Sequence, residues 1–292
     1  MIPLTENRIN TSRSMSAAPR LAHAVVGFSG GCCVGLVGWG GSQIVVPGLT
    51  HPAFGSMTQV TASAVSVSSQ SVAAAVQAAN YLQADAVDLQ VACSIALPSL
   101  LGARGGVALA RRLQPEVLSL IFNGGGVLLL PINFFVQRWR QQREACVAVQ
   151  TASIEIGYGR ALSTAAACAF GLGAGAVSAL MGVGGGPLAV SFLSLTTELP
   201  HHLVQGTASA AVVPGMLASS AFYAMHGSLP MATVATVTAG AVVGSTCGAQ
   251  AALHMSGETL RGCYMASLVL LGGRSCVAAG RNLVRILRQT RG

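Results

Sequence analysis

The 292-residue sequence carries too few charged side chains to cover a soluble protein of its length. Charged residues make up 8% of it, whereas soluble proteins average roughly 25%, and 52% of its residues are hydrophobic. All sixteen basic residues are arginine, and the net charge of +8 comes with no nucleic-acid recognition motif. We therefore exclude an ordinary soluble globule, expect no nucleic acid as a partner, and expect the lipid bilayer to surround most of the chain.

Uncharged stretches long enough to cross a bilayer recur along the chain. A helix needs about 20 residues to cross a hydrocarbon layer of about 30 Å, and 21–84 and 199–257 are free of Asp, Glu, Lys and Arg. Backbone groups in lipid must pair within their own segment, which favours helices. We predict an all-α polytopic membrane protein with about eight transmembrane helices: 21–38, 57–82, 86–110, 117–136, 161–181, 203–225, 231–253 and 260–280.

Polar segments divide the chain into two predicted membrane units. We expect a polar N-terminal tail (1–20), a first membrane repeat (21–136), a polar linker (137–160), a second membrane repeat (161–280) and a basic C-terminal tail (281–292). The first tail, with three arginines and several serines, fits either a short mitochondrial targeting segment or a cytosolic tail.

The two units share short sequence matches in the same order. Gln59–Ala64 matches Gln205–Ala210 at five of six positions, at a separation of 146 residues. Gly38–Gly41 matches Gly182–Gly185 at a separation of 144 residues. Each unit therefore reads as a four-helix repeat whose first helix ends in glycines. Internal repeats of this kind are typical of secondary transporters, whose substrate sites lie between the repeats.

A short apolar segment follows the first span of each unit, at 42–50 and at 187–197, and a glycine cluster joins each segment to its span. Neither segment is long enough to cross a bilayer alone. Each cluster should break the helix, because glycine adopts conformations closed to other residues, and Pro187 suits the first turn of a new helix. Whether these segments cross decides if the repeats are parallel or inverted.

The arginines gather on one side in an eight-span topology. Eleven then lie on the side of both termini, those of the linker included, and three, among them Arg111 and Arg112, lie on the other. This bias predicts that both termini face the cytoplasm or the mitochondrial matrix. The membrane is then a plasma membrane or an organelle membrane, the mitochondrial inner membrane included. A crossing by either short segment would change this assignment.

Two half-helices that start at the glycine clusters would point free N–H groups into a shared polar cavity, and such helix N-termini bind anions. Gln59 and Ser63 are four residues apart and share a helix face, as do Gln205 and Ser209. The alternative role for the clusters is close helix packing alone. The candidate substrate-binding residues are Gly38, Gly40, Gly41, Ser42, Gln59, Ser63, Gly182, Gly184, Gly185, Gly186, Gln205 and Ser209.

Some small and charged residues inside the spans allow simpler interpretations. The isolated pair Gly102 and Gly106 fits close helix packing. Arg104 and Arg274 are either anion ligands, because a guanidinium offers a planar fork of donors, or contacts to lipid headgroups. The sequence holds no enzyme motif and no metal-ligand spacing, so we expect neither an enzyme nor a cofactor nor a metal site.

The duplicated glycine motifs resemble those of the TauE/SafE sulfite exporter family of membrane permeases. That family has a glycine-rich motif followed by proline after the first helix of each half, similar to Gly38–Pro47 and Gly182–Pro187. Its next helix opens with small residues, as Gln59–Ala64 and Gln205–Ala210 do, and its third helix resembles Gly102–Arg112. The resemblance covers nearly all of the chain after residue 20. It implies transport of small anions such as sulfite or organosulfonates.

Two functions are compatible with the sequence. The first is a secondary transporter or permease for a small anion, bound between the repeats and moved by motion of one repeat against the other. The second is a transporter-derived structural subunit of a larger membrane complex, with little or no transport activity. A homo-oligomer or such a complex is a candidate assembly.

Overall fold

The structure, a computed structural model, describes residues 17–38, 41–52, 57–150, 164–182, 184–197, 199–227 and 229–289. Within these residues the chain forms ten α-helices and no β-strand, which confirms the all-α prediction. The helices are α1 (Ala17–Val37), α2 (Ser42–Thr50), α3 (Gln59–Gln83), α4 (Leu89–Arg112), α5 (Pro115–Gln150), α6 (Thr164–Met181), α7 (Gly186–Thr196), α8 (His201–Met225), α9 (Met231–His254) and α10 (Gly257–Gln289).

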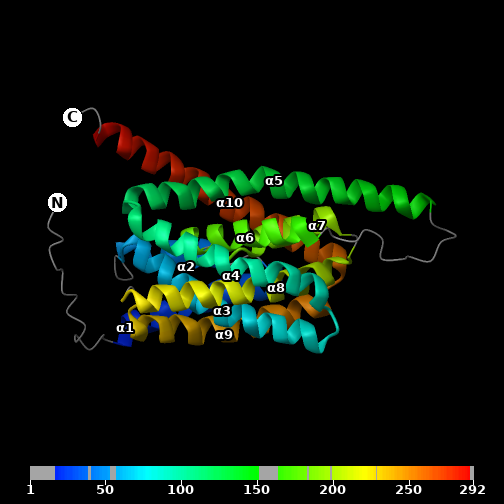
Figure 1. Cartoon of the computed structure of the whole chain (residues 1–292), viewed down its shortest axis with the longest axis horizontal. Helices are drawn as coiled ribbons and strands as arrows, with labels where there is room; N and C mark the ends of the chain where they lie inside the picture. Colours follow the sequence, from blue (N-terminus) through cyan, green and yellow to red (C-terminus); the bar gives the residue numbers. More distant parts are fainter. Residues whose placement is uncertain are drawn as a thin grey trace.

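The ten helices form two sets of five with the same order: a long helix, a short one and three long ones (Figure 1). The helices α3 and α8 both have 25 residues, and α4 and α9 both have 24. Every predicted span and both short segments are present as helices. Among the described residues, α1, α4, α8, α9 and α10 are long and apolar enough to cross a membrane. The chain is therefore a polytopic membrane protein.

Two helices run beyond their predicted ends. The helix α5 continues to Gln150, so the first part of the predicted linker is helical, while 151–160 lies outside the described residues. The helix α10 continues to Gln289, through most of the predicted basic tail. Charge ends a membrane span but not a helix, because arginine and glutamine are good helix formers. Of the predicted N-terminal tail, 1–16 lies outside the described residues.

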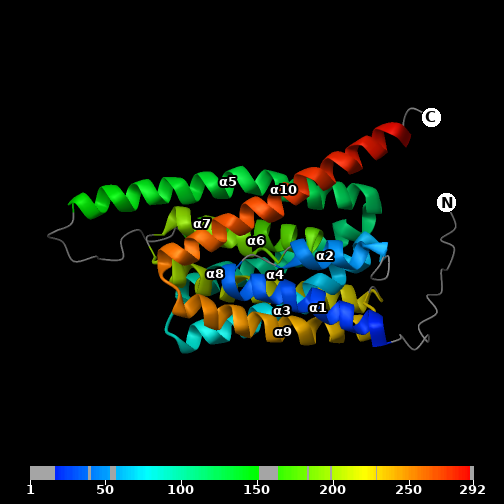
Figure 2. The same ribbon diagram turned by 180° about the vertical axis from the view of Figure 1, so that it is seen from behind.

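Contacts between helices show that the two sets run in opposite directions. The helix α1 is parallel to α9, whereas α6 and α8 are both parallel to α4. Because α9 follows α8 through a short turn and runs back, α6 is antiparallel to α1, and the repeats are inverted (Figures 1 and 2). The contacts are Gly27–Val237 and Gly35–Ser245 for α1 and α9, Gly171–Ile95 and Gly175–Ser99 for α6 and α4, and Gly215–Ser99 for α8 and α4, with Gly206 of α8 next to Ala86, just before α4 begins.

Each short helix turns back toward the pole at which the preceding long helix begins. A Cβ on Gly41 would overlap the carbonyl oxygen of Gly30, and a Cβ on Gly48 would lie 2.9 Å from Cγ1 of Val26, so α2 returns along α1. The helix α7 also turns back from α6 (Figures 1 and 2), but it packs against α8 and α5. The net crossings of each set are therefore those of its last three helices. An odd number of crossings per set produces inverted repeats.

The bundle has two distinct ends. The helix α1 begins and α10 ends at one of them, here called the terminal pole, while α5 ends and α6 begins at the other, the linker pole (Figures 1 and 2). Arg111 and Arg112, at the end of α4, lie at the terminal pole, and Arg138 of α5 lies toward the linker pole. The eight-span assignment of these arginines is therefore wrong, because α2 and α7 return to the pole at which α1 and α6 begin.

Rows of glycines on α1 and α4 allow close packing between helices of the two sets. A Cβ on Gly27, Gly31 or Gly35 of α1 would overlap a backbone carbonyl of α9. Gly102 and Gly106 of α4 meet α6 in the same way, which confirms close packing as their role. The first helix of each set thus packs on the fourth helix of the other set. Neither set is a separate body.

Candidate functional site

Both predicted helix breaks are present. The φ angles of Gly38 and Gly182 are +68° and +72°, a region that L side chains rarely adopt, and Gly184 and Gly185 also have positive φ. The helix α7 begins directly after these glycines, with Pro187 in its first turn. Within the described chain, no side chain caps the start of α2 or of α7. In α7, Pro187 has no N–H, so Gly186 and Leu188 hold the first-turn donors, and in α2 the N–H of Ile44 already donates to the carbonyl oxygen of Gly41.

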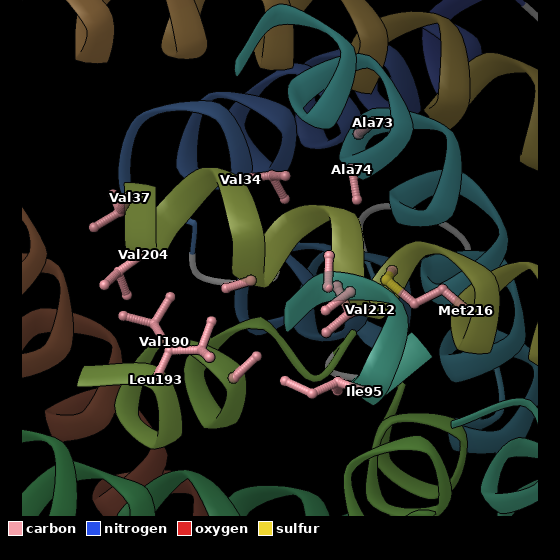
Figure 3. Close-up of a cluster of buried hydrophobic side chains, with 14 of the residues drawn as sticks. Val34, Val37, Ala73, Ala74, Ile95, Val190, Leu193, Val204, Val212 and Met216 are labelled. Atoms are coloured by element: carbon pink, nitrogen blue, oxygen red, sulfur yellow. The ribbon is translucent and has the colours of Figure 1, made fainter. Parts of the chain in front are cut away.

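The two breaks meet at a small central chamber. This cavity has a volume of about 10 Å³, which is room for about one water molecule. Figure 3 shows four of its apolar side chains, from α1, α3 and α8, within the buried core. The lining residues are Val34, Gly38, Gln70, Ala74, Gln77, Gly184, Gly186, Ser209, Val212 and Met216. Of the predicted site residues, Gly38, Gly184, Gly186 and Ser209 are therefore brought together.

Most of the polar side chains around the central chamber are paired with one another. Gln77 donates from Nε2 to the carbonyl oxygen of Gly35 (3.2 Å) and accepts at Oε1 from Ser209 Oγ (2.8 Å). Next to them, the Tyr81 hydroxyl donates to Gln205 Oε1 (2.8 Å). These bonds hold α3 against α1 and α8, so they form a frame around the chamber.

Gln70 differs from these residues because both atoms of its amide are unpaired in the described chain, whereas Gln205 lacks a partner only at Nε2. It is the twelfth residue of α3 and is fully buried, and neither Nε2 nor Oε1 has a hydrogen-bond partner within the described part of the chain. A Cβ on Gly30 would lie 3.1 Å from Nε2, so the amide sits tightly against α1. A buried polar group left unpaired costs about 1–3 kcal/mol. Gln70 lines the chamber, so a ligand that enters it could offset this cost by bonding to Nε2 and Oε1.

Ser63 and Gln205 support the two breaks from opposite sides. A Cβ on Gly182 would lie 3.0 Å from Cα of Ser63, and a Cβ on Gly38 would lie 3.6 Å from Cγ of Gln205. Ser63 is the fifth residue of α3 and Gln205 the fifth of α8, so the helix bounds relate them at a separation of 142 residues. The sequence match pairs Gln59 with Gln205 instead. That shift of four residues is about one turn, which keeps nearly the same helix face.

The remaining predicted residues do not share the central chamber. Ser42 is buried at the start of α2, Gly41 packs on α1, and Gly185 faces α8 beside the chamber. Gly40 lies outside the described residues. Gln59 lines a different cavity. The single site predicted from the sequence is therefore divided between two places.

That second cavity, of about 400 Å³, lies between α2, α5 and α10 at the terminal pole, and we call it the terminal-pole cavity. Arg274 lines it and donates from Nη1 to the backbone oxygen of Gln43 (2.9 Å). Arg104, by contrast, is exposed on α4 and does not line it. The structure thus separates two arginines that the sequence analysis treats alike.

A hydrogen-bonded cluster joins α5, α7 and α10 near the linker pole. The hydroxyl groups of Ser191 and Tyr264 both donate to Asn133 Oδ1. All three side chains are buried. We call this cluster the linker-pole seal, because Asn133 of α5 joins the returning half-helix α7 on one side to α10 on the other.

The sequence analysis does not select Gln70, Gln43 or Asn133. It favours residues that occur in both units, and the residue 142 positions after Gln70 is Val212. The available signal was the amide itself, which stands in the middle of a span without charge, where an unpaired polar group is costly.

The comparison with protein families supports this architecture. The family described as "Sulfite exporter TauE/SafE" matches residues 23–275, a range that includes both helix breaks, the central chamber and the linker-pole seal. Comparison with curated proteins and with solved structures gives no match.

Proposed function

The chain belongs to the sulfite exporter TauE/SafE family, whose members are membrane transporters, and we propose that it carries a small oxyanion through the central chamber. Sulfite or an organosulfonate is the proposed substrate. The anion binds between the two helix breaks, beside Gln70. Membership of a transporter family also agrees with a sequence that lacks enzyme motifs.

The observation that carries this proposal is the unpaired amide of Gln70 in the chamber wall. Its Nε2 can donate to one oxygen of the anion, and first-turn N–H groups of α7 can donate to another. The positive end of the helix dipole adds to this attraction. The Oε1 atom can accept from a protonated oxygen of the anion or from a water bound with it. The chamber is lined mostly by apolar side chains, and among the described residues that line it none carries a carboxylate, so its few donors face no competing negative charge.

Transport requires the chamber to widen, because a cavity of about 10 Å³ is too small for a sulfur oxyanion. Alternating access in inverted-repeat transporters is largely rigid-body movement around a fixed site. The rows of glycines hold α1 on α9 and α6 on α4. We therefore propose that α1, α2 and α9 move against α4, α6 and α7. The moving units in this proposal are therefore groups of helices from both repeats, and not the two sequence repeats themselves.

The distribution of arginines supports an orientation. Among the arginines of the described residues, six belong to segments at the terminal pole and four to segments at the linker pole: Arg20, Arg111, Arg112, Arg281, Arg285 and Arg288 at the first, and Arg138, Arg140, Arg143 and Arg261 at the second. The bias is smaller than in the eight-span topology but has the same direction, so we propose that the terminal pole faces the cytoplasm or the matrix. The membrane itself stays a prediction.

Transport is tested by sulfite and organosulfonate flux into liposomes that contain the full-length protein. We expect Gln70→Met to reduce flux to background and to raise the unfolding temperature, because it removes a buried unpaired amide. The matched control is Gln77→Met, whose amide is paired on both sides; it should lower the unfolding temperature.

Full flux in Gln70→Met would contradict the proposal. If the unaltered protein carries neither anion and purifies with stable partners, the function is that of a structural subunit. The same purification shows whether the protein forms a homo-oligomer.

A further inference from the structure

The terminal-pole cavity contains amide donors that the fold leaves unpaired. Gln43 is 3% exposed, and its Oε1 accepts from Ser275 Oγ (3.1 Å). Its Nε2 is buried and has no partner in the described chain. Gln59 Nε2, from the start of α3, is also buried and unpartnered there. Two residues that line one cavity thus each have an N–H₂ group without an acceptor in the described chain.

The same cavity concentrates positive charge. Arg274 and Arg281 both line it, and among the described residues that line it none carries a carboxylate. Arg274 uses Nη1 for the backbone oxygen of Gln43, but a guanidinium has five N–H donors. The two arginines repel each other, and an anion between them would offset both charges.

The shared fold does not require these donors. The helices α5 and α10 begin 142 residues apart and occupy equivalent places in the two sets. At the positions equivalent to Arg274 and Arg281, α5 has Ile132 and Trp139. The arginines are therefore a feature of one half, and the scaffold forms without them in the other.

We infer that the terminal-pole cavity is a second oxyanion site, at which Arg274, Gln43 and Gln59 bind the transported anion before it reaches the central chamber. The inference rests on the proposed function, since it assigns a loading site to the same substrate. The phosphate of a lipid headgroup has the same chemistry and can approach a cavity at a membrane pole. The experiment must therefore separate a free anion from a headgroup.

Calorimetric titration of the purified full-length protein with sodium sulfite counts the sites. We expect two sites in the unaltered protein and one in Arg274→Met, which retains the aliphatic stem but loses charge and donors. Gln70→Met should also retain one site. The matched control is Arg104→Met, an exposed arginine outside both cavities, which should retain two.

Sided flux measurements test the role of the site in loading. In liposomes sorted by an impermeant label on a C-terminal tag, Arg274→Met should raise the KM for sulfite supplied at the terminal pole about tenfold, the effect of one lost charge-assisted hydrogen bond. The KM at the linker pole should not change. Gln59→Met, at the edge of the cavity, should raise the terminal-pole KM less and serves as the second variant if Arg274→Met does not fold.

Two sulfite sites and an unchanged terminal-pole KM in the Arg274 variant would overturn the inference, and loss of flux in Gln70→Met would then leave the proposed function standing. Mass spectrometry of co-purified lipid tests the alternative ligand, a lipid headgroup. If Arg274→Met loses bound phospholipid while its sulfite sites stay at two, the cavity is a headgroup site and the inference is wrong. An unaltered protein that neither binds nor carries sulfite or an organosulfonate overturns both proposals.

Discussion

The two poles of the bundle are built from equivalent helices but differ in what fills them. At the terminal pole, Phe122 and Ser275 stand beside a cavity of about 400 Å³. At the equivalent positions near the linker pole, Tyr264 and Asn133 are buried and hydrogen-bonded to each other and to Ser191. The tyrosine hydroxyl therefore adds a hydrogen bond at the linker pole that Phe122 cannot make at the terminal pole.

This difference shows how an inverted duplication acquires a direction. The repeated features, two helix breaks and two glycine-packed helix pairs, build a frame with similar halves. Other features occur in one half only: Gln70, whose equivalent is Val212, lines the chamber, and Arg274, whose equivalent is Ile132, lines the terminal-pole cavity. The chamber and the terminal-pole cavity depend on substitutions that break the symmetry. The duplication alone would predict neither.

The largest expected effect is on stability, and it should differ between substitutions at the two helix breaks. Alanine at Gly38 or at Gly182 must adopt a positive φ, at a cost of about 1–2 kcal/mol. At Gly182 the new Cβ would also press on the Ser63 backbone at 3.0 Å, whereas at Gly38 its nearest neighbour would be 3.6 Å away. We expect Gly182→Ala to lower the free energy of unfolding more than Gly38→Ala, measured by thermal unfolding in detergent. An equal or reversed order would contradict the described geometry.

A smaller effect should follow from making the poles alike. Tyr264→Phe puts at the linker pole the residue that the terminal pole has at Phe122, and it removes the hydroxyl donor to Asn133. A net hydrogen bond contributes about 0.5–1.5 kcal/mol, so the closed seal should open several times more often. Hydrogen–deuterium exchange should become faster in α7 and at the start of α10. Unchanged exchange in α7 would show that the cluster does not close this pole.

The smallest effect concerns the glycines on the two faces of α4. Gly102 faces α6, whereas a Cβ on Gly105 would meet nothing within 4 Å. Gly105→Ala should therefore stabilise the protein by about 0.5–1 kcal/mol, because alanine is the better helix former. Thermal unfolding measures the change. A loss of stability would indicate that another protein surface covers this face, as the predicted homo-oligomer or larger complex would.

Much of the fold could be predicted from the sequence, because hydropathy and glycine content determine it locally. The spans and both short segments agree with the helices to within a few residues, apart from the long extensions of α5 and α10. The direction of the short segments could not be predicted, since length alone does not show whether a half-helix crosses or returns. That direction decides the repeat symmetry and the side of Arg111 and Arg138.

The candidate site could be predicted less completely. The helix breaks follow from glycine chemistry and are present at Gly38 and Gly182. Repetition could not reveal Gln70, whose importance comes from an amide without a hydrogen-bond partner among the described residues. Repetition also points to Gln59, and not to Ser63, as the counterpart of Gln205. The sequence match is shifted by four residues, about one helix turn, from the pairing that the helix bounds give. Burial and pairing are properties of the packed structure.

The most direct test of the central claim is a structure of the full-length protein determined by electron cryomicroscopy in the presence of sodium sulfite. We predict a widened chamber with an oxyanion between Gly38 and Gly184, within hydrogen-bond distance of Gln70 Nε2. A protein that carries sulfite in liposomes, yet has the bound anion elsewhere and an unchanged chamber, would contradict the account.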